Sequence, residues 1–351
     1  MESQKQPLLM STGDEPIVLS SQRGGASLVF CIFLIGCALL VALFAVVAIA
    51  MHGNPMGFFQ GLFPGISTDE AGPPSVTSPS TTQPPSSEPS PTPEQTPIVE
   101  MDLSYLSLGE GYLHNETPYT PNVEALLSAP LPKLTGEGPR VLILHTHTGE
   151  SYLSEGTTVL DGLPGDLTYS RDAERNVLAV GEELCRVLNA RGIETIHCTT
   201  LHDDPDLRNA YARSRETVQA YLERYPGIVY VIDLHRDAIL TGDGEYVRPL
   251  TPDGEGVAQV MAVVGSDCNG TVYDWEQNLA LALQLRQRLN QRCPALCRPV
   301  SLRRASYHQE LAPGYLLLEI GSGANTPEQA KRAAALVGET LADLLLDSQN
   351  E

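Results

Sequence analysis

Strand-like apolar runs alternate with amphipathic helical runs from residue 140 to the C-terminus. The last helical run starts with Thr326-Pro327-Glu328-Gln329, a capping-box pattern with Pro at the first helical position. This alternation favours a largely parallel sheet with helices packed on its faces. We therefore predict an α/β fold, a single three-layer domain over 140–351 with a mostly parallel central sheet flanked by helices. The predicted strands are 140–144, 193–197, 228–234, 258–264 and 315–320, and the predicted helices are 177–191, 207–225, 275–292 and 326–346.

An uncharged apolar run occupies residues 26–51. At 1.5 Å per residue it exceeds the ~30 Å hydrocarbon core of a bilayer, which predicts a single transmembrane helix. Ala48-Ile49-Ala50 has the form of a signal-peptide cleavage site, but the run is longer than the apolar region of a typical signal peptide. We expect a retained anchor in the cell membrane, with a cytoplasmic tail at 1–25 and an extracytoplasmic catalytic domain.

Residues 52–100 form a juxtamembrane segment and then a stretch rich in Pro, Ser and Thr. Such a composition cannot bury enough apolar surface to fold, so we predict a disordered, extended linker. Residues 101–139 are predicted to be an irregular lead-in with one short helix near 123–128.

The chain carries a net charge of −21, from 43 acidic and 22 basic residues. Nucleic acids are bound by basic surfaces, so this composition argues against a nucleic-acid partner. Sequence patterns of other catalytic classes are also absent. There is no nucleophile elbow, no Walker A loop and no H-E-x-x-H helix.

Potential metal ligands stand where predicted strands end, and the first segment holds His145, His147 and Glu150. Residues two apart in an extended strand share a face. The two imidazoles are therefore expected to point into one site if the strand continues that far, with Glu150 in the loop behind them.

The second segment is Asp233-Leu234-His235-Arg236-Asp237, which follows a buried apolar run. Asp233 and His235 alternate with Leu234 and so share a strand face. His235 is the predicted ligand of this segment. Asp233 or Asp237 is expected to orient an imidazole or to act as an alternative ligand.

The third segment ends an apolar strand with Glu319. An ionised carboxylate there is costly unless it is paired or bound to a metal. Strand ends of an open α/β sheet converge on one crevice, and two imidazoles with carboxylates suit a catalytic Zn²⁺. We predict that Glu319 is the general base of a metal-assisted hydrolysis.

Together these segments make the chain resemble the stage II sporulation protein P family, membrane-anchored cell-wall hydrolases of endospore formers. The resemblance covers about residues 142–341, and each motif alone would be weak. The matching motifs are Ile143-Leu144-His145-Thr146-His147-Thr148-Gly149-Glu150-Ser151-Tyr152, Asn176-Val177, His202-Asp203, Asp233-Leu234-His235-Arg236-Asp237-Ala238, Leu318-Glu319-Ile320-Gly321 and Asn325-Thr326.

The resemblance implies a zinc-dependent N-acetylmuramoyl-L-alanine amidase of peptidoglycan, with endopeptidase activity on stem-peptide crosslinks, acting during sporulation (engulfment). It also implies two partners, a sporulation lytic transglycosylase and a membrane protein that recruits both enzymes.

The chain is also similar to the wider zinc amidase superfamily, in which a His, an acidic residue and a second His bind zinc beside a catalytic Glu. His235 matches the second His and Glu319 matches the catalytic Glu. The superfamily pattern Gly-His-Gly-Gly aligns with His147, whereas His145 stands directly at the end of the predicted strand. Both histidines are therefore candidates for the first zinc ligand.

The acidic ligand of that superfamily precedes a helix Asn by four residues. Asp172 has this position relative to Asn176, although the superfamily has Glu there. Asp172 is therefore the ligand that the resemblance implies, and Glu150 is the competing one.

Two other functions fit parts of the pattern. The His145-x-His147 pair is similar to that of two-metal amidohydrolases, but their barrel needs eight strands and five are predicted. A catalytically inactive peptidoglycan-binding module would bind sacculi without releasing stem peptides.

Overall fold

The computed structural model describes residues 95–104, 111–162 and 168–349. The predicted tail, transmembrane helix and most of the predicted linker lie outside these residues. Within the described ranges, no helix is long and apolar enough to cross a membrane.

The central sheet has seven strands among the described residues, in the order β2–β9–β8–β10–β6–β3–β5. Neighbouring strands are parallel except β10 and β8, which are antiparallel. The predicted mostly parallel sheet is confirmed, and its open edges differ from a closed eight-stranded barrel. The strands are β2 (Leu113–Asn115), β3 (Val141–Leu144), β5 (Thr195–His197), β6 (Tyr230–Asp237), β8 (Val260–Val264), β9 (Val300–Leu302) and β10 (Gly314–Ser322).

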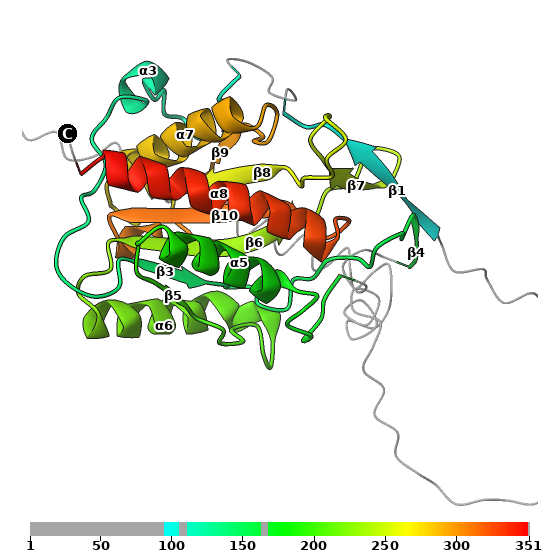
Figure 1. Cartoon of the computed structure of the whole chain (residues 1–351), viewed down its shortest axis with the longest axis horizontal. Coiled ribbons are helices and arrows are strands. Elements are labelled where there is room, and N and C mark those ends of the chain that lie inside the picture. The colour runs from blue at the N-terminus through cyan, green and yellow to red at the C-terminus, as the bar shows by residue number, and fades with distance from the viewer. Residues whose placement is uncertain (1–94, 105–110, 163–167, 350–351) are drawn as a thin grey trace, which may run out of the picture. The chain divides into compact units, whose positions relative to one another are not determined.

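Helices lie on both faces of this sheet (Figure 1). Three helices pack against Ile143 and Ile232 in one hydrophobic core: α5 (Val177–Ala190), α7 (Trp275–Arg292) and α8 (Pro327–Asp347). Helix α6 (Ala210–Arg224) contributes Val218 to a second core, with Leu142 and Val231 from the opposite face. The capping box predicted for the last helix is present, with Thr326 as its N-cap.

Side-chain alternation places the candidate catalytic side chains of β6 and β10 on the same face of the sheet. Ile232 and Leu234 of β6 pack in the core with α5, α7 and α8. Asp233 and His235 therefore point to the opposite face, the one on which α6 packs. Glu319 of β10 is the register partner of His235 and shares its face.

A separate three-stranded sheet has the order β4–β1–β7, with β1 (Gln95–Met101), β4 (Val159–Asp161) and β7 (Tyr246–Pro249). Strand β1 pairs in parallel with β7. The predicted linker extended to residue 100, so it is too long at its C-terminal end. The lead-in at 101–139 also joins the fold, since β2 pairs with β9 and Gln284 of α7 donates to Leu126 O of α3 (Val123–Leu126) at 3.0 Å.

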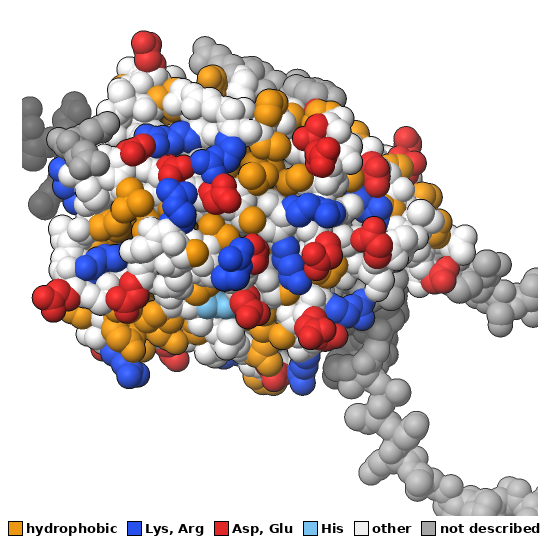
Figure 2. All heavy atoms as spheres, viewed as in Figure 1, with side chains coloured by type: hydrophobic (Ala, Val, Ile, Leu, Met, Phe, Trp, Pro, Cys, Tyr) orange, Lys and Arg blue, Asp and Glu red, His pale blue; other side chains and the backbone are white. Residues whose placement is uncertain are grey.

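Acidic and basic side chains are interspersed on the face that carries α5 and α8 (Figure 2). Two arginines bridge helices there. Arg191 contacts Asp343 at 2.5 Å, and Arg292 contacts Glu339 and Asp343 at 2.6 Å each. Among the described residues, this face therefore carries no large patch of a single sign.

Helices α5 and α8 approach closely where Gly338 faces Val187. A Cβ on Gly338 would lie 2.8 Å from Cγ1 of Val187 and 2.9 Å from its Cβ. Gly338→Val is therefore expected to lower the free energy of unfolding by about 1–3 kcal/mol, through overpacking. Thermal unfolding would measure the change, and adding Val187→Ala should restore part of it. An unchanged Tm in Gly338→Val would contradict this packing.

Candidate active site

Five polar side chains gather where β6 and β10 run side by side, and we call them the histidine–carboxylate cluster. Strands β6 and β10 supply three of them, and the turn after β3 supplies the other two. The members are His147, Glu150, Asp233, His235 and Glu319.

His235 lies at the centre of the cluster. Its Nδ1 is 3.2 Å from Oε2 of Glu150, and its Nε2 is 3.0 Å from Oδ1 of Asp233, the latter without hydrogen-bond geometry. The His147 ring stands edge-to-face to the His235 ring, with centroids 5.3 Å apart. Two imidazoles and two carboxylates therefore converge.

Charges in the cluster depend on one another. Burial disfavours an ionised His235, but Asp233 and Glu150 outweigh it and raise the pKa of His235 well above its ordinary value. In turn, burial is the largest influence on both carboxyls and opposes their ionisation. The charge and hydrogen bonding of His235, together with Thr146 for Asp233 and Arg236 for Glu150, outweigh it and lower both pKa values. The three groups thus form a buried ion-paired set.

Glu319 differs from the other carboxylates. Burial, and then the nearby charge of Asp237, raise its pKa to about 8. Asp237 acts on Glu319 through its negative charge. The same carboxylate forms an ion pair with Arg298 at 2.7 Å. A carboxyl with a pKa near neutrality is suited to accept and return a proton.

The turn after β3 decides which histidine enters the cluster. Asp233 accepts hydrogen bonds from the backbone N of Thr146 at 2.8 Å and from its Oγ1 at 2.6 Å. Thr148 Oγ1 donates to His145 O at 2.9 Å. These bonds end the strand at Leu144 and fold the chain into a turn, so the expectation that His145 and His147 share a strand face is wrong.

His145 instead lies on the opposite face of the sheet, fully buried under α5. Its Nδ1 donates to Leu234 O at 2.8 Å, and its Nε2 is 2.9 Å from Nε2 of His197. Gly181 of α5 packs against both rings, where a Cβ would lie 2.7 Å from each Nε2. Burial, and then His197, lower the pKa of His145 to about 3. Both of its ring nitrogens are thus engaged away from the cluster.

Asp172 is not brought into the cluster either. Its side chain is exposed, and Oδ1 accepts the backbone N–H of Glu174 at 3.1 Å in a local turn. The N-cap of α5 is Asn176, whose side chain accepts from Leu178 N. Of the two predicted acidic ligands, Glu150 is the one that contacts a cluster histidine.

Three buried polar atoms of the cluster have no hydrogen-bond partner among the described residues: Nδ1 of His147, Nε2 of His235 and Oε2 of Glu319. Unsatisfied buried polar atoms are rare in native proteins. In the described ranges, no three His, Cys, Asp or Glu side chains are already arranged as a metal cage. The donor types nevertheless fit zinc, which takes imidazole nitrogen and carboxylate oxygen as ligands.

Arg236 supports the cluster in a way that the sequence did not suggest. Its guanidinium donates to Ser151 O at 3.3 Å and to Thr168 O at 2.8 Å, and its backbone N donates to Glu150 Oε2 at 3.1 Å. Arg236 thereby fixes the segment that carries Glu150.

Tyr211, at the start of α6, also contacts the cluster, and the sequence did not single it out for the site. Its ring stands edge-to-face to His147, with centroids 5.5 Å apart. No local pattern connects a helix N-terminus to a turn so far away along the chain.

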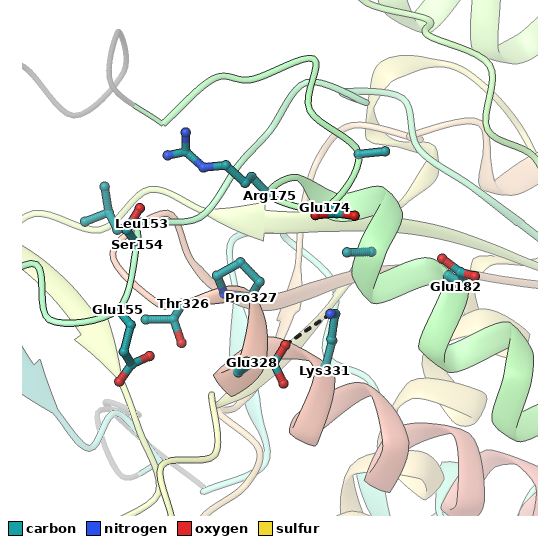
Figure 3. Close-up of a pocket in the computed structure, with 12 residues that line it drawn as sticks. Leu153, Ser154, Glu155, Glu174, Arg175, Glu182, Thr326, Pro327, Glu328 and Lys331 are labelled. Atoms are coloured by element: carbon teal, nitrogen blue, oxygen red, sulfur yellow. Dashed lines mark hydrogen bonds and ion pairs between the residues drawn. The ribbon is translucent and has the colours of Figure 1, made fainter.

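A cavity of about 600 Å³ lies between the N-terminal ends of α5 and α8 (Figure 3). It contains none of the cluster residues. Lys331 in its wall pairs with Glu328 at 3.1 Å, and the acidic side chains of the wall outnumber the basic ones. Its labelled lining residues are Leu153, Ser154, Glu155, Glu174, Arg175, Glu182, Thr326, Pro327, Glu328 and Lys331.

Sequence comparison matches residues 68–342 to the family described as stage II sporulation protein P. The chain is 28% identical over 233 residues to stage II sporulation protein P of Bacillus subtilis (strain 168). That match covers 63% of this chain and 54% of the relative, so the chain spans about half the length of the curated relative.

Solved structures of two amidases are more distant. N-acetylmuramoyl-L-alanine amidase AmiC2 of Nostoc punctiforme has a TM-score of 0.36 and 13% identity, over 62% of this chain and 100% of that one. The apo N-acetylmuramyl-L-alanine amidase Ami1 from Mycobacterium abscessus has a TM-score of 0.35 and 13% identity, over 61% and 100%.

Proposed function

Because the chain belongs to the stage II sporulation protein P family, we propose that it is a zinc-dependent peptidoglycan hydrolase of sporulation. Its proposed reaction cleaves the amide between N-acetylmuramic acid and L-alanine. The observation that carries this proposal is the convergence of His147, Glu150, His235 and Glu319 on one face of the sheet.

His147, Glu150 and His235 would hold the zinc ion, because they supply two imidazoles and a carboxylate from adjacent segments. When bound, zinc would act as a Lewis acid and lower the pKa of a water molecule to about 7. Asp233 would position the His147 imidazole instead, because it accepts the hydrogen bonds of Thr146 that fold the turn before that residue. His145 and Asp172 have no part in this proposal, since both lie outside the cluster.

Glu319 would perform the proton transfers. Its Oε2, which lacks a hydrogen-bond partner among the described residues, would accept a proton from the attacking water. The same carboxyl would then give that proton to the departing amine of L-alanine. The fixed register of Glu319 beside His235 keeps this base next to the proposed ligands.

The wider setting is part of the same proposal. The uncharged run at 26–51 would anchor the chain in the cell membrane, with residues 95–349 outside. Cleavage of stem-peptide crosslinks, a lytic transglycosylase partner and a recruiting membrane protein remain proposals that follow from the family.

Digestion of purified sacculi by the full chain tests the reaction. Mass spectrometry of the products should show stem peptides that begin with a free L-alanine amine, and uncut glycan strands. A chelator should abolish their release, and added Zn²⁺ should restore it, because the water would lose its acidifying ion. Binding to sacculi without release would indicate an inactive binding module, and release that resists chelation would rule out the zinc mechanism.

A further inference from the structure

Tyr307 and His308 form a strained pair in the loop between β9 and the short helix η3 (Gln309–Leu311). Their φ angles are 51° and 60°, in the left-handed region. Residues with a Cβ seldom adopt this conformation, because the Cβ crowds the following carbonyl. Such strain persists only where the surroundings impose it, and it concentrates at functional sites.

One side of the loop is fixed to the end of β8. The Gln309 side chain accepts from Gly265 N at 2.8 Å and donates to Val263 O at 2.8 Å. Gly265 lets the loop approach, since a Cβ there would lie 2.2 Å from Ala305 O. The backbone N of Ser266 also donates to Ala305 O, at 3.0 Å.

The other side is fixed to α6 through His308. Its Nε2 lies 2.7 Å from the backbone O of Tyr211, and its Nδ1 lies 3.2 Å from Nη1 of Arg215. A ring that donates from Nε2 and accepts at Nδ1 satisfies both contacts. Arg215 is held in turn by an ion pair with Glu310. The strained conformation is therefore imposed from two elements at once.

The Tyr307 ring lies next to Tyr211, which contacts the cluster. Its centroid is 6.4 Å from that of Tyr211, whose ring contacts His147. Both tyrosines are half-buried. Burial raises the pKa of Tyr307. We call Tyr211 and Tyr307 the aromatic wall.

We propose that the aromatic wall binds the N-acetylmuramic acid ring of the substrate, with the apolar C–H face of the sugar against Tyr307. This inference rests on the proposed hydrolase function and assigns the sugar side of the scissile amide. A pyranose has an apolar face and a hydroxyl rim, which match the apolar ring and polar tip of tyrosine.

Two substrates separate sugar binding from the chemical step. One is N-acetylmuramoyl tripeptide, and the other is the D-lactoyl tripeptide, which keeps the same amide and lacks the sugar ring. Tyr307→Gly removes the side chain at a position where glycine is unstrained, so the loop should keep its conformation. Tyr307→Phe is the matched control that retains the ring.

We expect Tyr307→Gly in the full chain to lower kcat/KM for the sugar substrate about five- to tenfold, mainly through KM. Its kcat/KM for the lactoyl peptide should equal that of the wild type, and Tyr307→Phe, which keeps the ring and loses the hydroxyl, should lose less than Tyr307→Gly on the sugar substrate. Equal losses on both substrates, or no loss on the sugar substrate, would overturn the inference. A wild-type chain that cleaves neither substrate would defeat the proposed function, and this inference with it.

Discussion

Replacing Glu319 with Gln is expected to reduce peptidoglycan hydrolysis by about 10²–10⁴-fold while leaving bound zinc unchanged. Gln has nearly the same shape but no site that accepts the proton of the attacking water. The raised pKa of Glu319, about 8, shows how strongly its surroundings resist a fixed negative charge. Rates of stem-peptide release and zinc content per chain, both measured on purified protein, would check this.

A matched change elsewhere separates chemistry from folding. Glu183→Gln removes a partly buried carboxylate on α5, which pairs with Arg186 at 2.7 Å. This variant changes nothing in the cluster and should hydrolyse at the wild-type rate. Hydrolysis by Glu319→Gln at that same rate would exclude Glu319 as the base.

Glu319→Gln should lose activity without losing stability. A carboxyl with a folded-state pKa near 8 holds its proton more tightly in the folded chain than in the unfolded one, where the value is about 4.3. The stability that this proton contributes is complete below pH 4.3 and is lost as the pH rises towards 8. Since Gln does not titrate, zinc-free Glu319→Gln should melt no lower than the wild type at pH 7.

The second large effect distinguishes the two histidines after β3. His147→Gln is expected to weaken zinc binding by more than about 100-fold and to abolish hydrolysis, because direct ligands matter more than the residues that orient them. His145→Gln should keep zinc. Its cost should appear as a loss of about 1–3 kcal/mol of stability, because His145 is buried and contacts Leu234 O and His197.

Zinc content and thermal unfolding of both variants would decide between these roles. If His145→Gln loses zinc and His147→Gln retains it, the ligand assignment is reversed. The same comparison applies to the acids, where Glu150→Gln should lose zinc and Asp172→Asn, in an exposed turn, should not.

Long periodic segments were predictable from the sequence. The helix predicted at 275–292 is α7, with the same bounds, because its apolar period extends over five turns. The strand predicted at 315–320 lies within β10. Strands of three residues, such as β2 and β9, have no readable alternation, and only their pairing in space defines them.

The part of the candidate site that lies on β6 and β10 was also predictable from the sequence. Asp233 and His235 share a face, and Glu319 lies beside them, because strand alternation is a local rule that a sequence displays directly. The aromatic wall was not predictable, since α6 supplies Tyr211 and the loop after β9 supplies Tyr307.

The sequence by itself determined the α/β alternation, the ends of the main strands and the residue types that stand there. Those features depend on side-chain periods of two and 3.6, which operate within one segment. The tertiary structure decided that His147 and Glu150, rather than His145 and Asp172, join His235. That choice depends on the turn at Thr146, which Asp233 holds from a neighbouring strand 87 positions away. A hydrogen bond between such distant residues leaves no local pattern, so only the folded chain reveals it.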